Sequence, residues 1–320
     1  MPAFPFPDMA GLLDKARTRI ASPAQYLRKV REDRRYAIYD LLPIVTDPRL
    51  RDRLAGLIAL RRPRTSGFAP SATARDWCRR LETDGITPLL PPIDAGVAAD
   101  LRRHFEAEPC HDPYRPHLGR FHADAPPSRE INMGYYAVEQ ILRAPHVLAL
   151  LNDRRVLETA ELYLGCKPLL DNIGCWWSFG DREVAKGTQR LHRDLDSLRG
   201  FKVFFYLTDV DEAGGPHVFV KGSHRSPRLG TGRALPDAEV AAAFGADRAV
   251  SVTGPAGSWF LVDTYGFHKG AVPRGGRRLL LTAQYNINRT PHAPRQPVLD
   301  RATAGYDPFV NQIYLARLPA

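Results

Sequence analysis

The sequence predicts an all-β core with helical additions, and two observations support this fold class. Short β-type runs separated by Gly and Pro turns fill residues 168–288, whereas the first half of the chain carries apolar residues at helical spacing. Many short strands of this kind are typical of a jelly-roll barrel, also called a double-stranded β-helix. We therefore expect a barrel core at about 166–290, with the N-terminal helices packed outside it.

Composition excludes several classes of protein. The chain has 320 residues, of which 44% are hydrophobic and 25% charged, as in ordinary globular proteins. No apolar run approaches the roughly eighteen residues of a membrane span. The N-terminus lacks a basic region followed by an apolar stretch, so we expect no secretory signal and a cytoplasmic location. Because none of the four cysteines forms a CxxC pair, we expect reduced thiols and no zinc knuckle.

The positive charge is concentrated near the N-terminus. The net charge is +10, and residues 1–80 hold 17 Lys and Arg against 8 Asp and Glu. Solvated helix faces would explain this excess, since Arg is a common helix former, and we favour that interpretation. A dock for an anionic partner, such as a nucleotide, an acyl carrier or a membrane surface, is the alternative. Aromatic residues are not interleaved with the charges, so we expect no nucleic-acid partner.

The first helices and the domain boundary follow from local signals. Ser22 and Pro23 form a helix start, and residues 24–42 carry apolar residues at helical spacing. Residues 49–60 predict a second helix, and 61–71 (RRPRTSGFAPS) read as a linker. The predicted division is a basic helical extension at 1–75, a main domain at 76–290 and a C-terminal tail at 291–320.

Three more helices and one long strand are predicted before the barrel motifs. The helices are expected at 74–83, 94–105 and 145–164, and the strand, LLDNIGCWWSF, lies within 168–179. Residues 106–130 read as an irregular loop that contains His111, His117 and His122. No metal-site spacing fits these histidines, so we expect a lid or a substrate loop.

The chemistry is concentrated at three residues. His192 and Asp194 are two positions apart, so on a strand both side chains would point to the same face. His268 follows a second apolar run, SWFLVDTYGF, and a barrel can bring that strand end beside the first pair. Two imidazoles and one carboxylate are the ligands expected of a non-haem Fe(II) oxygenase, since they leave open positions on the metal. A lone His-x-Asp more often lies on the surface, so the surrounding sequence decides.

Over roughly residues 82–288 this sequence resembles the phytanoyl-CoA dioxygenase family of Fe(II)/2-oxoglutarate oxygenases. The matching pieces are LETDGITPL, HRD, YLTDVDEAGGPHVFVKGSHR, AGSWFLVDTYGFHKG and the arginine in RRLLL. The resemblance implies that His192, Asp194 and His268 bind Fe(II). It also implies that the arginine on the strand after the second histidine holds the distal carboxylate of 2-oxoglutarate, with O2 as the oxidant.

Two adjacent arginines compete for that role. Neighbours on a strand face opposite ways, so only one of Arg277 and Arg278 can enter the barrel. The spacing usual in the family favours Arg278, and a buried guanidinium binds a carboxylate in a planar, bidentate manner. Many relatives place a hydroxyl two residues after the second histidine, but here that position is Gly270.

Further residues are expected to contact the cosubstrate. Asn172 on the predicted strand and Gln189 just before the iron pair are candidates for hydrogen bonds to it. Lys202 would be an anion contact if its face lines the barrel, or a strand-end lysine that points to solvent, and both alternatives stay open. His217 and His224 flank a turn and are expected to be structural.

The resemblance implies hydroxylation of an unactivated C–H bond, with release of succinate and CO2. Related halogenases replace the carboxylate ligand with a small residue, so the presence of Asp194 favours hydroxylation or desaturation. We expect a small-molecule or carrier-bound substrate, and the basic composition favours an anionic one only weakly. Two alternatives are a non-catalytic, cupin-like barrel that binds a small molecule or sugar, and a zinc-dependent hydrolase. Substrate identity and oligomeric state do not follow from the sequence.

Overall fold

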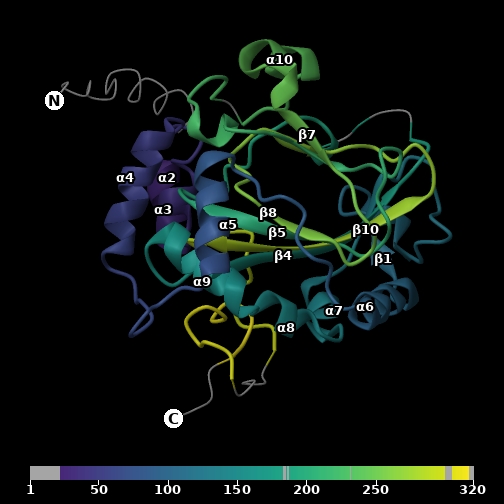
Figure 1. The fold of residues 1–320 in the computed structure, drawn as a ribbon, viewed down its shortest axis with the longest axis horizontal. Coiled ribbons are helices and arrows are strands. Elements are labelled where there is room, and N and C mark those ends of the chain that lie inside the picture. The colour runs from purple at the N-terminus through teal and green to yellow at the C-terminus, as the bar shows by residue number, and fades with distance from the viewer. Residues whose placement is uncertain (1–21, 183–184, 186, 231, 300–304, 317–320) are drawn as a thin grey trace.

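A computed structural model describes residues 22–182, 185, 187–230, 232–299 and 305–316. Two antiparallel sheets and a set of helices outside them make up the fold (Figure 1). Part of the predicted tail, and the first 21 residues of the predicted extension, lie outside the described residues. None of the described helices is long and apolar enough to cross a membrane.

The larger sheet has seven strands in the order β2-β1-β3-β4-β10-β5-β8, and the smaller has the order β7-β6-β9. The strands of the larger sheet are β1 (Cys110–His111), β2 (Arg120–Phe121), β3 (Met133–Tyr135), β4 (Leu169–Phe179), β5 (Gly200–Tyr206), β8 (Trp259–Val262) and β10 (Arg277–Asn286). Those of the smaller sheet are β6 (His217–Val220), β7 (Ala249–Val252) and β9 (His268–Gly270).

A short bridge completes the jelly roll. His192 pairs with His268, which adds the segment at 191–192 to the smaller sheet beside β9. The core of the larger sheet then reads β4-β10-β5-β8, and the smaller sheet reads 191–192, β9, β6, β7, with antiparallel neighbours throughout. Eight strands divided between two facing sheets in this way form the double-stranded β-helix that the sequence predicts.

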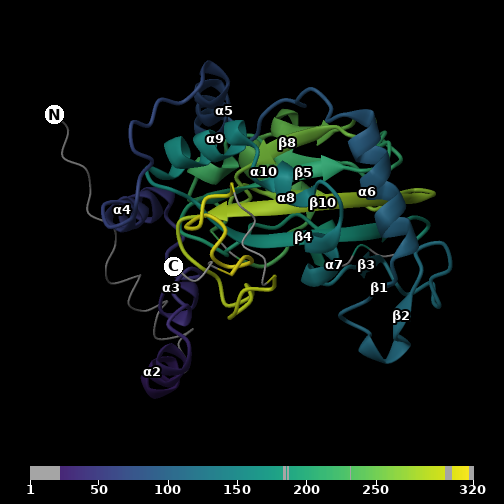
Figure 2. The same cartoon turned by 90° about the horizontal axis from the view of Figure 1, so that it is seen from below.

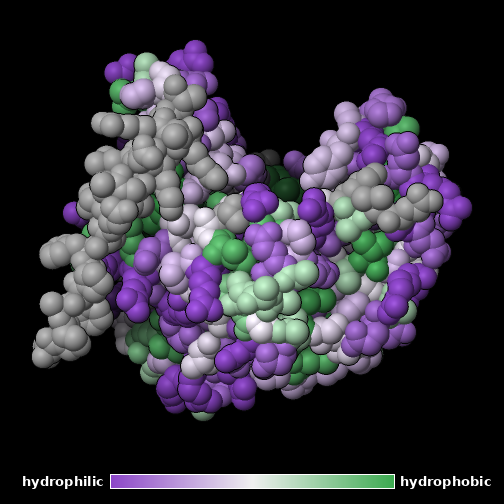
Figure 3. Space-filling model, turned by 90° about the horizontal axis from the view of Figure 1, so that it is seen from above, coloured by the Kyte–Doolittle hydropathy of each residue, from purple (hydrophilic) through white to green (hydrophobic). Residues whose placement is uncertain are grey.

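Helices lie outside the two sheets. They are α2 (Pro23–Glu32), α3 (Tyr36–Tyr39), α4 (Pro48–Ala59), α5 (Ala72–Thr83), α6 (Ala95–Ala107), α7 (Val138–Arg143), α8 (Val147–Leu151), α9 (Arg154–Leu164) and α10 (Asp237–Phe244). Figure 2 shows α2 and the β1–β2 segment projecting to the same side of the molecule, and Figure 3 shows its surface hollowed between two such projections.

Strand alternation separates an inner face from an outer one. On β5, Phe204 and Tyr206 point into the space between the sheets, whereas Phe201 and Phe205 pack against the helices. The same parity on β10 sends Leu280 inward. The inner apolar cluster is therefore small, and the outer cluster, shared with the helices, is the main core of the molecule.

The predicted extension is attached to the barrel. Arg51 on α4 is buried and donates hydrogen bonds to the backbone carbonyls of Ser197 and Val45. Arg199, just before β5, forms an ion pair with Asp52 on the same helix at 2.8 Å. The division of the chain near residue 75 stays a prediction.

Two long predicted helices are each divided in two. The helix expected at 24–42 breaks after α2, where Asp33 is extended (φ −152°) and its carboxylate binds the side chain of Arg35. The helix expected at 145–164 breaks between α8 and α9. There Asp153 accepts hydrogen bonds from the N–H groups of Arg155 and Val156 and begins a new helix. Apolar periodicity was continuous across both breaks, so these two predictions were wrong.

The cap at Asp153 yields a stability prediction. Asp153→Ala is expected to lower the free energy of unfolding by about 1 kcal/mol, because two N–H groups of α9 lose their acceptor. Chemical denaturation would measure the loss. Asp153 also pairs with the half-exposed Arg155, so Arg155→Ala is the control and is expected to cost less. Equal losses in the two variants would contradict the capping role.

Candidate functional site

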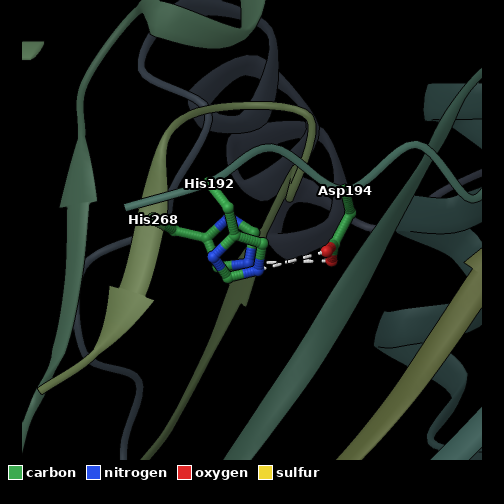
Figure 4. A group of neighbouring side chains, drawn as sticks. All are labelled: His192, Asp194 and His268. Atoms are coloured by element: carbon green, nitrogen blue, oxygen red, sulfur yellow. Dashed lines mark ion pairs between the residues drawn. The ribbon is translucent and has the colours of Figure 1, made fainter. Parts of the chain in front are cut away.

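Three side chains converge at the mouth of the barrel. One potential ligand atom from each of His192, Asp194 and His268 lies within 4.8 Å of the others. His192 Nε2 is 3.4 Å from one carboxylate oxygen of Asp194, and His268 Nε2 is 3.6 Å from the other. Figure 4 shows the two imidazoles side by side, both directed toward the carboxylate. The spacing suits three ligands arranged around one metal ion.

Backbone carbonyls fix the orientation of both imidazoles. Nδ1 of His192 lies 2.8 Å from the carbonyl oxygen of Arg190, and Nδ1 of His268 lies 2.9 Å from that of Gly266. Because a carbonyl can only accept, each Nδ1 carries the proton and donates it. Each Nε2 is then left with a free lone pair facing Asp194, as a metal ligand requires.

The backbone holds the triad in register. His192 and His268 exchange two N–H···O=C bonds of 3.0 Å, and the N–H of Asp194 donates to the carbonyl of Thr264 at 2.9 Å. Arg193 between them points the opposite way, where its buried guanidinium donates to the carbonyls of Ser223 and Tyr265. Alternation along this segment therefore turns His192 and Asp194 to one face, as their spacing predicts.

The electrostatics differ between the two histidines. Burial acts to lower the pKa of His192, but Asp194 outweighs it and raises that pKa. Burial and the neighbouring His192 lower the pKa of His268 to about 3, so its imidazole is neutral. Burial acts to raise the pKa of Asp194, but Lys202 and the two histidines outweigh it and hold that pKa well below its usual range. Asp194 is therefore an ionised carboxylate beside a neutral imidazole.

Lys202 lies inside the barrel and pairs with Asp194. Its Nζ is 2.6 Å from Asp194 Oδ2 and 3.5 Å from Asp196 Oδ2. Burial acts to lower the pKa of Lys202, but the two carboxylates outweigh it and raise that pKa. Of the two alternatives left open by the sequence, the inward one is the observed one, although the anion that Lys202 contacts is the carboxylate of Asp194.

Arg278, and not Arg277, enters the barrel. Arg278 is 3% exposed and donates from Nη2 to Ser178 Oγ at 3.0 Å and from Nη1 to the carbonyl of Gly215. Arg277 faces outward, stacks over Trp177 and pairs with Glu106 at 3.7 Å. Arg278, in contrast, forms no ion pair with any carboxylate in the described part of the chain. A buried guanidinium without a counter-charge is costly, so this cavity is built for an anion.

The glycine at position 270 gives the guanidinium room. A Cβ built on Gly270 would lie 3.0 Å from Arg278 Nη2, closer than most side-chain contacts. The hydroxyl that many relatives carry at this position would press on the arginine here. Ser178 lies opposite Arg278 in the β4–β10 pair of the larger sheet, and its hydroxyl accepts a hydrogen bond from the guanidinium.

One cavity of about 300 Å³ joins these groups. Its walls include the three candidate metal ligands and the predicted cosubstrate residues Asn172, Gln189, Lys202 and Arg278. An aromatic pair, Tyr135 and Trp176, lines it as well, with ring centroids 5.7 Å apart. Gln189 is held by a hydrogen bond of 2.8 Å from Asn132. The structure thus brings every predicted site residue to one cavity, whereas their roles stay predictions.

Sequence reasoning missed several residues of the cavity. His217 was expected to be structural, yet it lines the cavity between His268 and Phe204. Met133 and Tyr135 reach the cavity from β3, a strand that the sequence did not predict. No local pattern marks His217, because its place in the cavity depends on the register of β6 with β9. His111, His117 and His122 join no group of three potential metal ligands among the described residues.

Comparisons with known proteins found distant structural likenesses. No protein-family model matches the sequence, and no curated protein matches it. Among similar solved structures is EctD from S. alaskensis with bound Fe, at 21% identity and TM-score 0.48, covering 81% of this chain and 94% of that one. Another is the non-heme alpha ketoglutarate dependent epimerase SnoN from nogalamycin biosynthesis, at 21% identity and TM-score 0.49, covering 77% and 96%.

A third similar structure is HygX from Streptomyces hygroscopicus with nickel, 2-oxoglutarate and hygromycin B bound. It has 17% identity and a TM-score of 0.47, and the match covers 74% of this chain and 96% of HygX. The names of these structures include an epimerase as well as proteins with bound Fe or 2-oxoglutarate. Likenesses at this distance do not assign a reaction to the present chain.

The pair of Lys202 and Asp194 yields a prediction for the metal-free protein. Lys202→Met leaves two buried carboxylates without their cation, so the free energy of unfolding is expected to fall by about 3–5 kcal/mol. A divalent metal would restore part of this loss, because it supplies positive charge at Asp194. Thermal unfolding with and without Mn(II) measures both effects. Lys221→Met, which removes a half-exposed pair with Asp84 at 4.0 Å, is the control and is expected to cost at most about 1 kcal/mol.

Proposed function

We propose that this chain is an Fe(II)/2-oxoglutarate-dependent oxygenase of the phytanoyl-CoA dioxygenase type. The proposed reaction is hydroxylation of an unactivated C–H bond in a small-molecule or carrier-bound substrate. One observation carries the proposal: two imidazole nitrogens and one carboxylate converge in a cavity that also contains a buried guanidinium without a carboxylate partner among the described residues.

The three candidate ligands fit Fe(II). Each Nε2 has a free lone pair because its Nδ1 donates to a backbone carbonyl, and Asp194 is ionised. Two imidazoles and one carboxylate occupy one side of a metal and leave the opposite positions open. Asp194 is already engaged by Lys202 through Oδ2, which favours coordination through Oδ1 alone. Lys202 would then hold the carboxylate in one orientation.

Arg278 fits the distal carboxylate of 2-oxoglutarate. Its guanidinium is buried in the wall of the same cavity, and Ser178 and Gly215 fix two of its nitrogens. A planar guanidinium recognises a carboxylate with two parallel hydrogen bonds. The dicarboxylic cosubstrate would therefore extend from the metal toward Arg278, with Asn172 and Gln189 as polar neighbours.

Bound Fe(II), with 2-oxoglutarate and O2, supplies an oxidant that breaks a C–H bond while the cosubstrate is converted to succinate and CO2. The protein residues position the reactants and keep water out. Tyr135 and Trp176 form an apolar wall on which part of a substrate can pack. Binding two reactants in one closed cavity fixes their orientation, which is the main contribution of the protein to such a reaction.

The arginine weighs against the two alternative functions. A zinc hydrolase would use the same three ligands, and a sugar-binding barrel would keep the fold. Neither gives Arg278 a carboxylate to neutralise its buried charge. A cosubstrate with a distal carboxylate does, so we favour the oxygenase.

Anaerobic titration with Fe(II) and 2-oxoglutarate tests the proposal. The wild-type protein is expected to develop a weak visible charge-transfer band, and His192→Ala is expected to lose it because one ligand is missing. With a substrate, the expected product is heavier by one oxygen, with succinate released. A wild-type protein without the band, or an undiminished band in the variant, would contradict the proposal.

The adjacent arginines provide a matched pair of variants. Arg278→Ala is expected to raise the dissociation constant of 2-oxoglutarate about a hundredfold, on the order of 2–3 kcal/mol, because a buried charge partner is lost. Arg277→Ala removes the same side chain from the outer face and is expected to leave the constant within a factor of two. Equal effects in the two variants would remove Arg278 from the cosubstrate site. The anaerobic titration measures both.

A further inference from the structure

His217 and Gly270 are paired across two strands of the smaller sheet. The β6–β9 register places His217 directly opposite Gly270, and residues that face each other in an antiparallel pair project to the same side. Both residues line the cavity that contains Arg278. The imidazole at 217 therefore occupies the side of the sheet where position 270 contributes no side chain.

The guanidinium of Arg278 reaches from the larger sheet to the neighbouring ends of these two strands. Its Nη1 donates to the carbonyl of Gly215, two residues before His217, and its Nη2 is the nearest atom to a Cβ built on Gly270. His217 thus borders the place where the distal carboxylate of the cosubstrate would meet Arg278. The backbone of His217 is itself fixed, because its N–H donates to the hydroxyl of Tyr206 at 2.9 Å.

The imidazole of His217 has a ring nitrogen without a hydrogen-bond partner. The residue is 3% exposed, and its Nε2 is buried without a hydrogen-bond partner. An imidazole carries at least one N–H donor in either protonation state. Buried polar groups in folded proteins are nearly always hydrogen-bonded, so an unpartnered one in a cavity wall indicates a ligand.

We propose that His217 is a cosubstrate-binding residue that donates a hydrogen bond to the distal carboxylate of 2-oxoglutarate beside Arg278. It thereby takes the role of the hydroxyl that is absent at Gly270. This inference rests on the proposed function. The exchange is physically coherent, since a side chain at 270 would press on Arg278, whereas its cross-strand neighbour reaches the same space from the opposite strand.

Packing alone is the competing explanation. The ring of His217 contacts Phe204 at 4.7 Å and Phe260 at 5.4 Å between ring centroids, and it stacks on His268 at 5.5 Å. Phenylalanine would keep much of that ring packing but cannot donate a hydrogen bond. Asparagine is smaller but keeps a donor. The two substitutions therefore separate hydrogen bonding from packing.

The experiment measures binding of 2-oxoglutarate and of 2-oxopentanoate, which lacks the distal carboxylate, to the Fe(II)-loaded protein without O2. His217→Phe is expected to raise the dissociation constant of 2-oxoglutarate about tenfold, while that of 2-oxopentanoate stays within a factor of two. His217→Asn is expected to recover part of the loss. His224→Phe, at another buried histidine that does not line this cavity, is the control and is expected to change neither constant.

Each outcome decides the role of His217. An unchanged preference for 2-oxoglutarate over 2-oxopentanoate in His217→Phe would overturn the inference, and so would equal weakening of both ligands. If His217→Phe does not fold, His217→Leu replaces it as the variant without a donor, and a wild-type preference for 2-oxoglutarate in His217→Leu would overturn the inference. If the wild-type protein binds Fe(II) and 2-oxoglutarate, the proposed function stands in all these cases. If the wild-type protein binds neither, both the proposed function and the inference about His217 are wrong.

Discussion

The site depends on one backbone pairing, the two hydrogen bonds that His192 and His268 exchange. These residues are far apart in the chain, and each lies at the end of its strand. Pairing them aligns the carbonyls of Arg190 and Gly266 under the two imidazoles and places Asp194 opposite, beside Thr264. The ligand geometry is therefore a property of the smaller sheet, and Val240 of helix α10 packs against that sheet at Leu191 and Phe267, the residues before the two histidines.

The second constraint is charge inside the cavity. Two cations enter it: Lys202 is neutralised by Asp194 and Asp196, and Arg278 by no described carboxylate. At the end near the metal ligands, positive and negative side chains therefore balance. At the end with Arg278, a bound anion would be needed to balance the guanidinium. The asymmetry is what the proposed dicarboxylic cosubstrate would match. The unpartnered imidazole of His217 lines the same cavity as Arg278.

Predictions from the sequence were most accurate in strands, where successive side chains alternate between the two faces. Alternation along β10 correctly sends Arg278, Leu280, Thr282 and Gln284 into the cavity and Arg277 outward. It was least accurate where a polar residue caps a new helix inside a stretch whose apolar residues keep helical spacing. Asp153 caps a new helix inside a stretch whose periodicity is uninterrupted, and a side chain can serve as a cap only when the backbone turns there. The strands β1, β2 and β3 were not predicted, because two or three residues are too few to show alternation.

The sequence by itself determined the barrel, the ligand types and which face of each strand they occupy, because these follow from residue chemistry and strand alternation. Only the tertiary structure decided which strands lie opposite each other, and hence that Lys202 meets Asp194, that Ser178 meets Arg278 and that His217 faces Gly270. The physical reason is that register between distant strands is set by the packing of the two sheets as a whole, and no local pattern encodes it.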